Sequence, residues 1–455
     1  MSDAKNTAEH IAANYDLRVP RYTSYPTAPH FQPGFPEETY REWLAALDPK
    51  TPLSLYFHIP FCDSMCWFCG CYTKIVKRRE PVMAYLETML QEVDLIAEAL
   101  PSRFSAKHVH FGGGSPTMLE ASEFRKVFDK VRQHFDIDEK AEFAVELDPR
   151  TATEDYVKGL AEAGVNRASI GVQDFDAEVQ EAINRIQPFD VTKRVVDWLR
   201  KYGIEKINMD LLYGLPHQNM DRVMAMVEKA NQLRPHRIAL FGYAHVPWMK
   251  SHMKMIHEED LPSTAERWVQ VEAAMAKLQE YGYIKIGLDH FALPEDEMAQ
   301  ALQNAQLHRN FQGYTVDQAS VMIGMGASSI GAMPQGYTQN ILPLKDYKKA
   351  IESGHLPIGK GLAFKGDDLL RGEIIERLMC DLKVDVDAVC AKYDVDPTPY
   401  RAEFAKLNNL LADGYASIDG GKLAMSEDGR SLVRIAAAAF DTYLDMGQKR
   451  HSKAV

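Results

Sequence analysis

Four of the six cysteines in this chain lie within ten residues, and this spacing constrains the chain more than any other feature. The four are Cys62, Cys66, Cys69 and Cys71, in the sequence FCDSMCWFCGC that begins at Phe61. A disulfide framework spreads cysteines through a small secreted chain, whereas this chain has 455 residues and one tight cluster. Such clustering indicates metal binding or catalysis. Cys380 and Cys390 lie in apolar, helix-like sequence and are predicted to be buried core residues.

The spacing C-x3-C-x2-C favours an iron–sulfur cluster over structural zinc. Structural zinc usually takes two pairs of ligands, and no second C-x2-C or H-x3-H pair follows in this sequence. Thiolates from a short loop of this kind hold iron–sulfur clusters. Three thiolates on a four-iron cluster leave one iron open, where an exogenous molecule can bind. The spacing alone leaves open whether Cys71 is a fourth ligand or a free thiol.

Short β-favouring runs alternate with helix-like segments between residues 53 and 242. Strands are predicted at 53–59, 108–111, 142–147, 167–172, 205–212 and 237–242, and helices at 81–100, 121–135, 153–163, 176–184, 190–202 and 219–233. This alternation is typical of parallel βα units. It predicts an α/β fold, a partial (β/α)6 TIM-like barrel, with a doubly wound sheet as the alternative.

Polar residues or glycines follow five successive predicted strands. They are the cysteine loop, the run Gly112–Gly114, Glu146 with Asp148, Gln173 with Asp174, and Asp210. Chemistry in such folds gathers at the carboxyl ends of the strands. Asp148 and Asp174 have an alternative as helix N-caps. The glycine run lacks the spacing of a dinucleotide fingerprint or a P-loop, but its position makes a close backbone approach to a ligand plausible.

The rest of the chain has a different character. Residues 262–281 are predicted helical, 285–291 a strand and loop, and 306–343 are rich in Gly, Gln, Asn and aromatic residues. From about residue 365 two helices precede a hairpin, at 414–418 and 422–426, and a helix at 428–444. This order resembles a winged helix. We therefore expect four parts: an N-terminal segment at 1–50, the barrel at 51–300, a glycine- and aromatic-rich, ligand-contacting region at 301–364, and a C-terminal helical, winged-helix-like domain at 365–455.

The charge balance argues against nucleic-acid binding. The chain has 52 Lys and Arg against 64 Asp and Glu, a net charge of −12, whereas a general nucleic-acid binder needs clustered cations. The C-terminal region is therefore expected to face the substrate or act as a lid. No apolar run approaches the roughly 20 residues that span a bilayer, and the N-terminus has no apolar signal region. We expect a cytoplasmic protein without a membrane partner.

Several ordered motifs point to a known family. The loop Cys62-x3-Cys66-x2-Cys69, with an aromatic residue at Phe68, resembles the radical S-adenosylmethionine (SAM) superfamily. Within it, the chain resembles the oxygen-independent coproporphyrinogen III oxidase family. The motifs are PRYTSYPT from Pro20, HIPFC from His58, the Cys69-Gly70-Cys71 ending, Asn184-Arg185, DLLYGLP from Asp210 and HRNFQGY from His308. They cover essentially the whole chain. Ser115 departs from the family's usual threonine but keeps its hydroxyl group.

The resemblance implies a radical reaction. Cys62, Cys66 and Cys69 would hold a [4Fe–4S] cluster, and the open iron would be chelated by SAM. Reductive cleavage of SAM would give methionine and a 5′-deoxyadenosyl radical, which takes a hydrogen from a propionate β-carbon. Loss of CO2 and one electron then leaves a vinyl group. Two such reactions convert coproporphyrinogen III to protoporphyrinogen IX.

The resemblance also implies two SAM molecules, side by side. The first would contact Tyr56, Gly113, Glu146, Ala244 and Ile330, and the second would contact Phe68, Gly114, Ser115, Gln173, Arg185 and Asp210. Cys71 would lie near the second SAM rather than on the cluster. Arg185 suits the SAM carboxylate and counts with the three cysteines as catalytic; its alternative is a surface helix arginine. Tyr56 has an alternative as a core strand residue.

The resemblance also leads to expectations about the substrate and the other partners, and it implies that region 301–364 contacts substrate and SAM. Arg21, His290, His308 and Arg309 are candidates to bind propionates, although His308 and Arg309 could instead cap a helix end or pair with Asp residues. Segment 15–31 would close the site. An electron donor such as flavodoxin or ferredoxin and a monomeric state are expected from the family. The alternatives are a haem chaperone of the same family, a radical SAM enzyme that degrades haem, and a structural zinc protein.

Overall fold

The centre of the molecule is a thirteen-stranded sheet in the computed structural model, which describes residues 2–444. Six adjacent parallel strands follow one another in chain order: β2 (Leu53–Ile59), β5 (Ser105–Gly113), β6 (Asp136–Leu147), β7 (Arg167–Gln173), β8 (Lys206–Tyr213) and β9 (Arg237–Gly242). A doubly wound sheet reverses its strand order at a switch point, and this series has no reversal. The partial-barrel prediction is confirmed.

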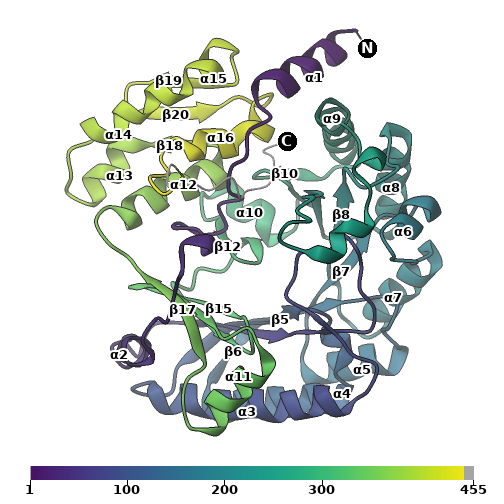
Figure 1. The fold of residues 1–455 in the computed structure, drawn as a ribbon, viewed down its shortest axis with the longest axis vertical. Coiled ribbons are helices and arrows are strands. Elements are labelled where there is room, and N and C mark those ends of the chain that lie inside the picture. The colour runs from purple at the N-terminus through teal and green to yellow at the C-terminus, as the bar shows by residue number, and fades with distance from the viewer. Residues whose placement is uncertain (1, 445–455) are drawn as a thin grey trace.

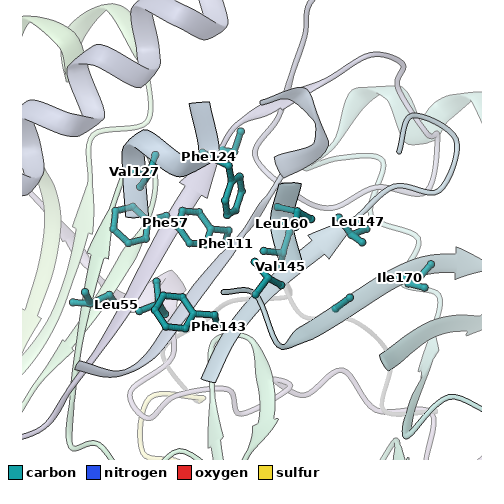
Figure 2. Packing of buried hydrophobic residues seen from close by; sticks show 14 of the residues in the cluster. Leu55, Phe57, Phe111, Phe124, Val127, Phe143, Val145, Leu147, Leu160 and Ile170 are labelled. Carbon is teal, nitrogen blue, oxygen red and sulfur yellow. The ribbon is translucent and has the colours of Figure 1, made fainter. Parts of the chain in front are cut away.

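Helices connect these strands and cover the outer face of the sheet (Figure 1). They are α3 (Glu80–Ala99), α4 (Ala121–His134), α5 (Glu154–Ala163), α6 (Ala177–Ala182), α7 (Phe189–Lys201) and α8 (Met220–Leu233). The main core lies between helices and strands, where Figure 2 shows Phe57, Phe111 and Phe124 packed together. The ring centroids of Phe111 and Phe124 are 4.4 Å apart. This apolar contact fixes the sheet so that its strand ends can position the site.

The sheet extends beyond the predicted strands on both sides. On one side lie β14 (Val321–Met325), β15 (Ile330–Met333), β16 (Gly336–Asn340), β17 (Ile358–Ala363) and β1 (Gln32–Pro33); on the other lie β11 (His290–Ala292) and β10 (Ile284–Ile286). Only β14 among these is parallel to its inner neighbour, β2. The strand and loop expected at 285–291 correspond to β10 and the turn after it, and a second short strand that was not predicted, β11, pairs back on β10 as a hairpin. The sequence around β14–β16 is rich in glycine and amide residues, which strands usually avoid.

The two aspartates proposed as helix N-caps do not cap helices. Thr153 caps α5, and Asp176 caps α6. Asp148 instead pairs with arginines at the site, and Asp174 is buried and accepts a hydrogen bond from Gln218. The N-cap prediction was wrong because, in each loop, a side chain that directly precedes the helix occupies the cap position.

The C-terminal elements form a second core together with the N-terminus, at the upper left of Figure 1. They are α12 (Asp368–Asp381), β18 (Lys383–Asp385), α13 (Val386–Lys392), α14 (Thr398–Ala402), α15 (Asn408–Ala412), β19 (Ala416–Asp419), β20 (Lys422–Met425) and α16 (Val433–Ala438). Helices followed by a hairpin match the winged-helix-like prediction, and Cys380 and Cys390 are buried as expected. The helix predicted at 428–444 ends at Ala438, because the Asp441 carboxylate accepts a hydrogen bond from the Tyr443 backbone and turns the chain. Residues 445–455 of the last domain lie outside the described residues.

The remaining elements complete the chain. They are α1 (Ser2–Asn14), α2 (Glu37–Ala45), β3 (Phe61–Cys62), β4 (Lys74–Ile75), α9 (Thr264–Glu280), α10 (Glu297–Gln303), β12 (His308–Asn310), β13 (Gly313–Thr315) and α11 (Leu344–Glu352). Buried residues of the N-terminal segment, including Tyr15, Tyr22 and Tyr25, share the second core. None of the described helices is long and apolar enough to cross a membrane.

A buried glutamate ties α3 to the turn that follows β14. The Glu92 carboxylate accepts hydrogen bonds from the backbone of Gly326 at 2.7 Å, from Asn340 at 2.6 Å and from the Tyr347 hydroxyl at 2.5 Å. Gly326 has φ +94°, and a Cβ there would lie 2.5 Å from the Tyr85 hydroxyl oxygen. Glycine is therefore required where this turn packs against α3.

We expect Glu92→Ala to lower the free energy of unfolding by about 2–4 kcal/mol, because three buried donors lose their acceptor. Burial raises the pKa of Glu92 to about 7, although its hydrogen bonds favour ionisation. In the unfolded chain this pKa is about 4.3, so this group makes the unfolding free energy fall as pH rises from about 4.3 to 7. Urea unfolding at several pH values should show that the unfolding free energy of the variant falls less steeply over this pH range. Glu87 lies on the same helix and its side chain is 60% exposed, so Glu87→Ala should change neither the unfolding free energy nor its dependence on pH.

Candidate active site

The cysteine loop leaves the carboxyl end of β2 and is tied to the glycine run after β5. The backbone N–H of Gly114 donates to the Ile59 carbonyl at 2.8 Å, and that of Ser115 donates to the Phe61 carbonyl at 2.7 Å. A Cβ at Gly114 would lie 2.6 Å from the Phe61 carbonyl oxygen. The glycine therefore lets the two loops approach closely, which sets the position of the cysteines relative to the sheet.

Twelve of the fifteen predicted site residues line one cavity of about 190 Å³ at the strand ends. They are Cys62, Cys66, Phe68, Cys69, Cys71, Gly113, Gly114, Ser115, Glu146, Gln173, Arg185 and Asp210. Eleven of them come from five successive strand ends, and Arg185 comes from the loop between α6 and α7. The structure thus brings these strand ends together around one cavity, while the site and the roles of its residues stay predictions.

Three predicted residues lie outside this cavity. Tyr56 is on β2, where its ring stacks on His110 with centroids 5.8 Å apart. Gly324 of β14 pairs with Tyr56 in register and also packs against the backbone of Ile330. Ala244 follows β9 and lines a second cavity. Contact of these three residues with the first SAM therefore stays a prediction.

Arg185 is buried, with a side chain 7% exposed, so its alternative as a surface residue is wrong. Its Nη2 donates to the Gly171 carbonyl at 2.7 Å and lies 3.3 Å from Asp148 Oδ1, and its Nη1 lies 3.5 Å from Cys66 Sγ. Its Nε is buried and, among the described residues, has no hydrogen-bond partner. This unpaired donor beside the thiols is suited to an anionic ligand.

Two further groups contact the sulfurs and were not singled out from the sequence. Arg150 Nη2 lies 3.4 Å from Cys66 Sγ and 2.6 Å from Asp148 Oδ2, and the Thr73 hydroxyl donates to Cys62 Sγ at 3.2 Å. Burial opposes ionisation of Asp148, but Arg185 and Arg150 outweigh it and keep its pKa below the usual value. The position of Arg150 just after a strand end was only a weak indication of a functional role, because an Asp–Arg pair at such a position is often structural.

The cysteine thiols lie in different environments. Burial raises the pKa of the Cys62 thiol to about 11, whereas a hydrogen bond from the Cys71 thiol lowers the pKa of Cys69 to about 6. His252 lies 2.7 Å from the Cys69 carbonyl oxygen, and Lys250 donates to that of Cys71 at 3.0 Å. These side chains hold the end of the loop from the segment after β9.

Acidic residues also line the cavity. Glu146 accepts a hydrogen bond from the Gly113 backbone at 3.2 Å, and Asp210 accepts one from Asn208 at 2.9 Å. Burial, with a contribution from Glu146, raises the pKa of Asp210 to about 6. The carboxylates and the Arg185 guanidinium in one cavity match the ammonium, hydroxyl and carboxylate groups of an amino-acid nucleoside such as SAM.

The residues fit a cluster held by three cysteines. Cys62, Cys66 and Cys69 line one wall of the cavity, and Arg150, Arg185 and Thr73 supply the hydrogen bonds that tune such clusters. In the part of the chain that the structure describes, no three His, Cys, Asp or Glu side chains are grouped to hold a single metal ion. Thiolates that each bind a different iron of a cluster need not converge on one point.

The predicted propionate ligands separate in the structure. Arg21 lines the second cavity, but His290 is bonded to Asp289 at 2.8 Å and His308 to Glu376 at 3.1 Å. Arg309 is buried with its guanidinium 4.3 Å from the centroid of the Tyr314 ring. The alternative that His308 pairs with an aspartate is wrong, because its partner is a glutamate, whereas Arg309 does lie 4.0 Å from Asp289.

Comparisons with known proteins cover nearly the whole chain. The radical SAM superfamily matches residues 56–230, and the HemN C-terminal domain matches residues 365–432. The oxygen-independent coproporphyrinogen III oxidases of Bradyrhizobium diazoefficiens and Paracoccus denitrificans are 47% and 44% identical to this chain. Those alignments cover 98% and 97% of this chain, and 99% and 97% of the relatives.

The chain belongs to the oxygen-independent coproporphyrinogen III oxidase family. Its structure matches the coproporphyrinogen III oxidase (HemN) of Escherichia coli, a radical SAM enzyme, with a TM-score of 0.89 and 35% identity. That match covers 93% of this chain and 98% of the E. coli chain. Membership of this radical SAM family implies a [4Fe–4S] cluster and SAM as cofactors; the cysteine spacing predicted the cluster, and the family resemblance predicted both.

Proposed function

We propose that this protein converts coproporphyrinogen III to protoporphyrinogen IX by decarboxylating two propionates to vinyl groups. The observation that carries the proposal is the cavity that gathers three cysteines, Arg185 and the carboxylates of Glu146 and Asp210, in a chain related over its full length to these oxidases. When bound, the cluster and SAM supply the 5′-deoxyadenosyl radical that removes a hydrogen from the substrate. The haem chaperone and the haem-degrading enzyme are not favoured, because the named relatives are oxidases.

The residues of the chain bind and position the reactants. We propose that Cys62, Cys66 and Cys69 hold the cluster and that Arg185 binds a SAM carboxylate. The division of the other contacts between two SAM molecules stays a proposal. The residues proposed to contact the first SAM are Tyr56, Gly113, Glu146, Ala244 and Ile330. Phe68, Gly114, Ser115, Gln173, Arg185 and Asp210 are proposed for the second. The burial of the Arg185 side chain supports its proposed role in binding the SAM carboxylate, because a buried guanidinium binds an anion more strongly than an exposed one.

We also propose that the chain consists of four parts, at 1–50, 51–300, 301–364 and 365–455. Segment 15–31 is proposed to cover the site. Arg21 in this segment donates to the Gly242 carbonyl at 2.7 Å, and Tyr22 donates to Asp441 at 3.0 Å. These contacts support a segment that joins the barrel to the C-terminal domain. A cover of this kind limits quenching of a radical by water and oxygen.

An anaerobic assay tests the proposed function. Cluster-loaded protein is incubated with coproporphyrinogen III, SAM and a strong reductant, and the products are read by mass spectrometry. We expect the substrate to lose one CO2 and two hydrogens, and then the same again. SAM cleavage without any loss of mass from the porphyrinogen would contradict the proposed substrate, and haem would then be tested.

We propose that an electron carrier such as flavodoxin or ferredoxin reduces a monomeric, cytoplasmic enzyme. The proposal of a monomer is supported because the cluster and SAM residues come from one chain, and a reducing compartment fits six free cysteines. The surface beside the cysteine loop carries Lys74, Lys77 and Arg78, although the chain has a net charge of −12. The Lys77 side chain is 69% exposed and pairs with Asp63 at 3.0 Å, so one of the three positive charges is offset, and the remaining local charge favours an acidic carrier.

The double variant Lys77→Glu/Arg78→Glu should slow reduction by such a carrier about tenfold at low salt. Reduction by dithionite, which needs no docking surface, should stay unchanged. The matched control is Arg125→Glu/Lys126→Glu on α4, where both side chains are 54% exposed. Stopped-flow absorbance of the cluster measures the rates. Equal rates for the two double variants would contradict this surface as the docking site.

A further inference from the structure

Asp148 pairs with two arginines that both reach the sulfur of Cys66. Arg150 Nη2 lies 2.6 Å from Asp148 Oδ2 and 3.4 Å from Cys66 Sγ. Arg185 Nη2 lies 3.3 Å from Asp148 Oδ1, and its Nη1 lies 3.5 Å from the same sulfur. The Arg150 and Asp148 side chains are 17% and 14% exposed. Two positive charges and one negative charge therefore lie largely buried beside one predicted cluster ligand.

The two arginines use their donors differently. Arg150 directs Nε to Asp148 Oδ1 at 3.0 Å and Nη2 to Oδ2, a bidentate pair within one loop. The backbone N–H of Arg150 also donates to Oδ1 at 3.0 Å. Arg185 is held by the Gly171 carbonyl at 2.7 Å, and its buried Nε has no hydrogen-bond partner within the described residues. Arg185 thus keeps a donor for a ligand, whereas Asp148 holds the fork of Arg150 against the sulfur.

A positive charge at this sulfur has a defined effect on electron uptake. Reduction of the cluster proposed on Cys62, Cys66 and Cys69 adds one electron from the carrier and makes or breaks no bond. The reduced state is therefore more negative by one charge than the oxidised state. Positive charges and hydrogen bonds at a cysteine sulfur favour the more negative state and raise the reduction potential. Burial strengthens the effect, because salt screens buried charges much less than exposed ones.

We propose that Arg150 sets the reduction potential of the cluster through Cys66, and that Asp148 is the positioning residue that holds Arg150 there. The inference rests on the proposed cluster ligands and not on the identity of the substrate. It gives Arg150 a role separate from that of Arg185, which is proposed to bind SAM. The carboxylate of Asp148 also offsets part of the positive charge at the sulfur. Loss of the charge at position 150 and loss of the charge at position 148 should therefore shift the potential in opposite directions.

Potentiometric titration of anaerobic, cluster-loaded protein without SAM tests the proposal, with electron paramagnetic resonance of the reduced cluster as the signal. Arg150→Met should make reduction about tenfold less favourable, a fall in midpoint potential of about 59 mV for one electron. Arg150→Lys keeps the charge and should stay closer to the wild type. Asp148→Asn removes the negative charge and should raise the potential, because Arg185 remains bonded to Gly171. Arg150→Met should also weaken SAM binding far less than Arg185→Met does.

The matched control is Arg237→Met, at the amino end of β9 and away from the strand ends that form the cavity. Arg237 is also buried and pairs with an aspartate, Asp296, at 2.7 Å. Its loss should lower the melting temperature without moving the potential.

Iron content is measured in every variant. An unchanged potential in Arg150→Met with full iron content, or shifts of the same sign in Arg150→Met and Asp148→Asn, would overturn the inference. If Arg150→Met loses its iron, the direction of the shift in Asp148→Asn decides. A wild-type protein that takes up no cluster would refute the proposed ligands together with this inference. The expected shifts without decarboxylation of coproporphyrinogen III would refute the proposed function alone.

Discussion

Replacing Cys66 with serine should remove most of the bound iron and lower SAM cleavage at least about a hundredfold. The Cys66 thiol is buried and receives the guanidinium groups of Arg150 at 3.4 Å and of Arg185 at 3.5 Å. An alcohol is a far poorer iron ligand than a thiolate, and the two arginines would then face no anionic sulfur. Iron analysis, the visible absorption of the cluster and 5′-deoxyadenosine production measure the effect.

Cys71→Ser provides the informative comparison, because its thiol lies beside Cys69 but is predicted not to bind iron. We expect this variant to keep its full iron content, whatever its effect on SAM. Cys390→Ser, in the buried core of the C-terminal domain, controls for loss of a thiol far from the site. Equal iron loss in Cys66→Ser and Cys71→Ser would show four cysteine ligands and contradict an open iron.

Arg185→Met should weaken SAM binding about 10- to 100-fold while the cluster remains. Methionine fills a similar volume but cannot donate, so the carboxylate of SAM would lose its buried partner. Asp148 would still pair with Arg150 at 2.6 Å, which limits structural damage. Arg185→Lys keeps the charge without the planar fork and should recover only part of the affinity. Equilibrium binding of SAM to reconstituted protein gives the values.

The control for Arg185→Met is Arg200→Met on the outer helix α7. Arg200 also donates to a backbone carbonyl, that of Leu233 at 2.7 Å, but it lies away from the cavity. This variant should bind SAM like the wild type. If Arg185→Met binds SAM with unchanged affinity and retains its iron, Arg185 is a structural residue that holds Asp148 and Gly171.

The sequence alone determined the parts of this protein whose signals are local. The C-x3-C-x2-C spacing places three thiols on one short loop, and a side chain's preference for strand or helix acts over a few residues. For that reason the parallel strands, their helices and the polar strand ends could all be read from the sequence. Parallel strands carry their carboxyl ends to one rim, which is why eleven predicted residues met in one cavity.

Only the tertiary structure decided which distant residues complete the site. Arg150 and Thr73 reach the sulfurs through contacts between elements that have no shared local pattern. Strands β14–β17 form from glycine- and amide-rich sequence because neighbouring strands supply their hydrogen bonds. Asp148 leaves its expected cap because it pairs with Arg150 of its own loop and with Arg185 from the loop after α6, while Thr153 takes the cap position. Long-range packing and charge pairing are fixed by three-dimensional proximity, which a single sequence does not contain.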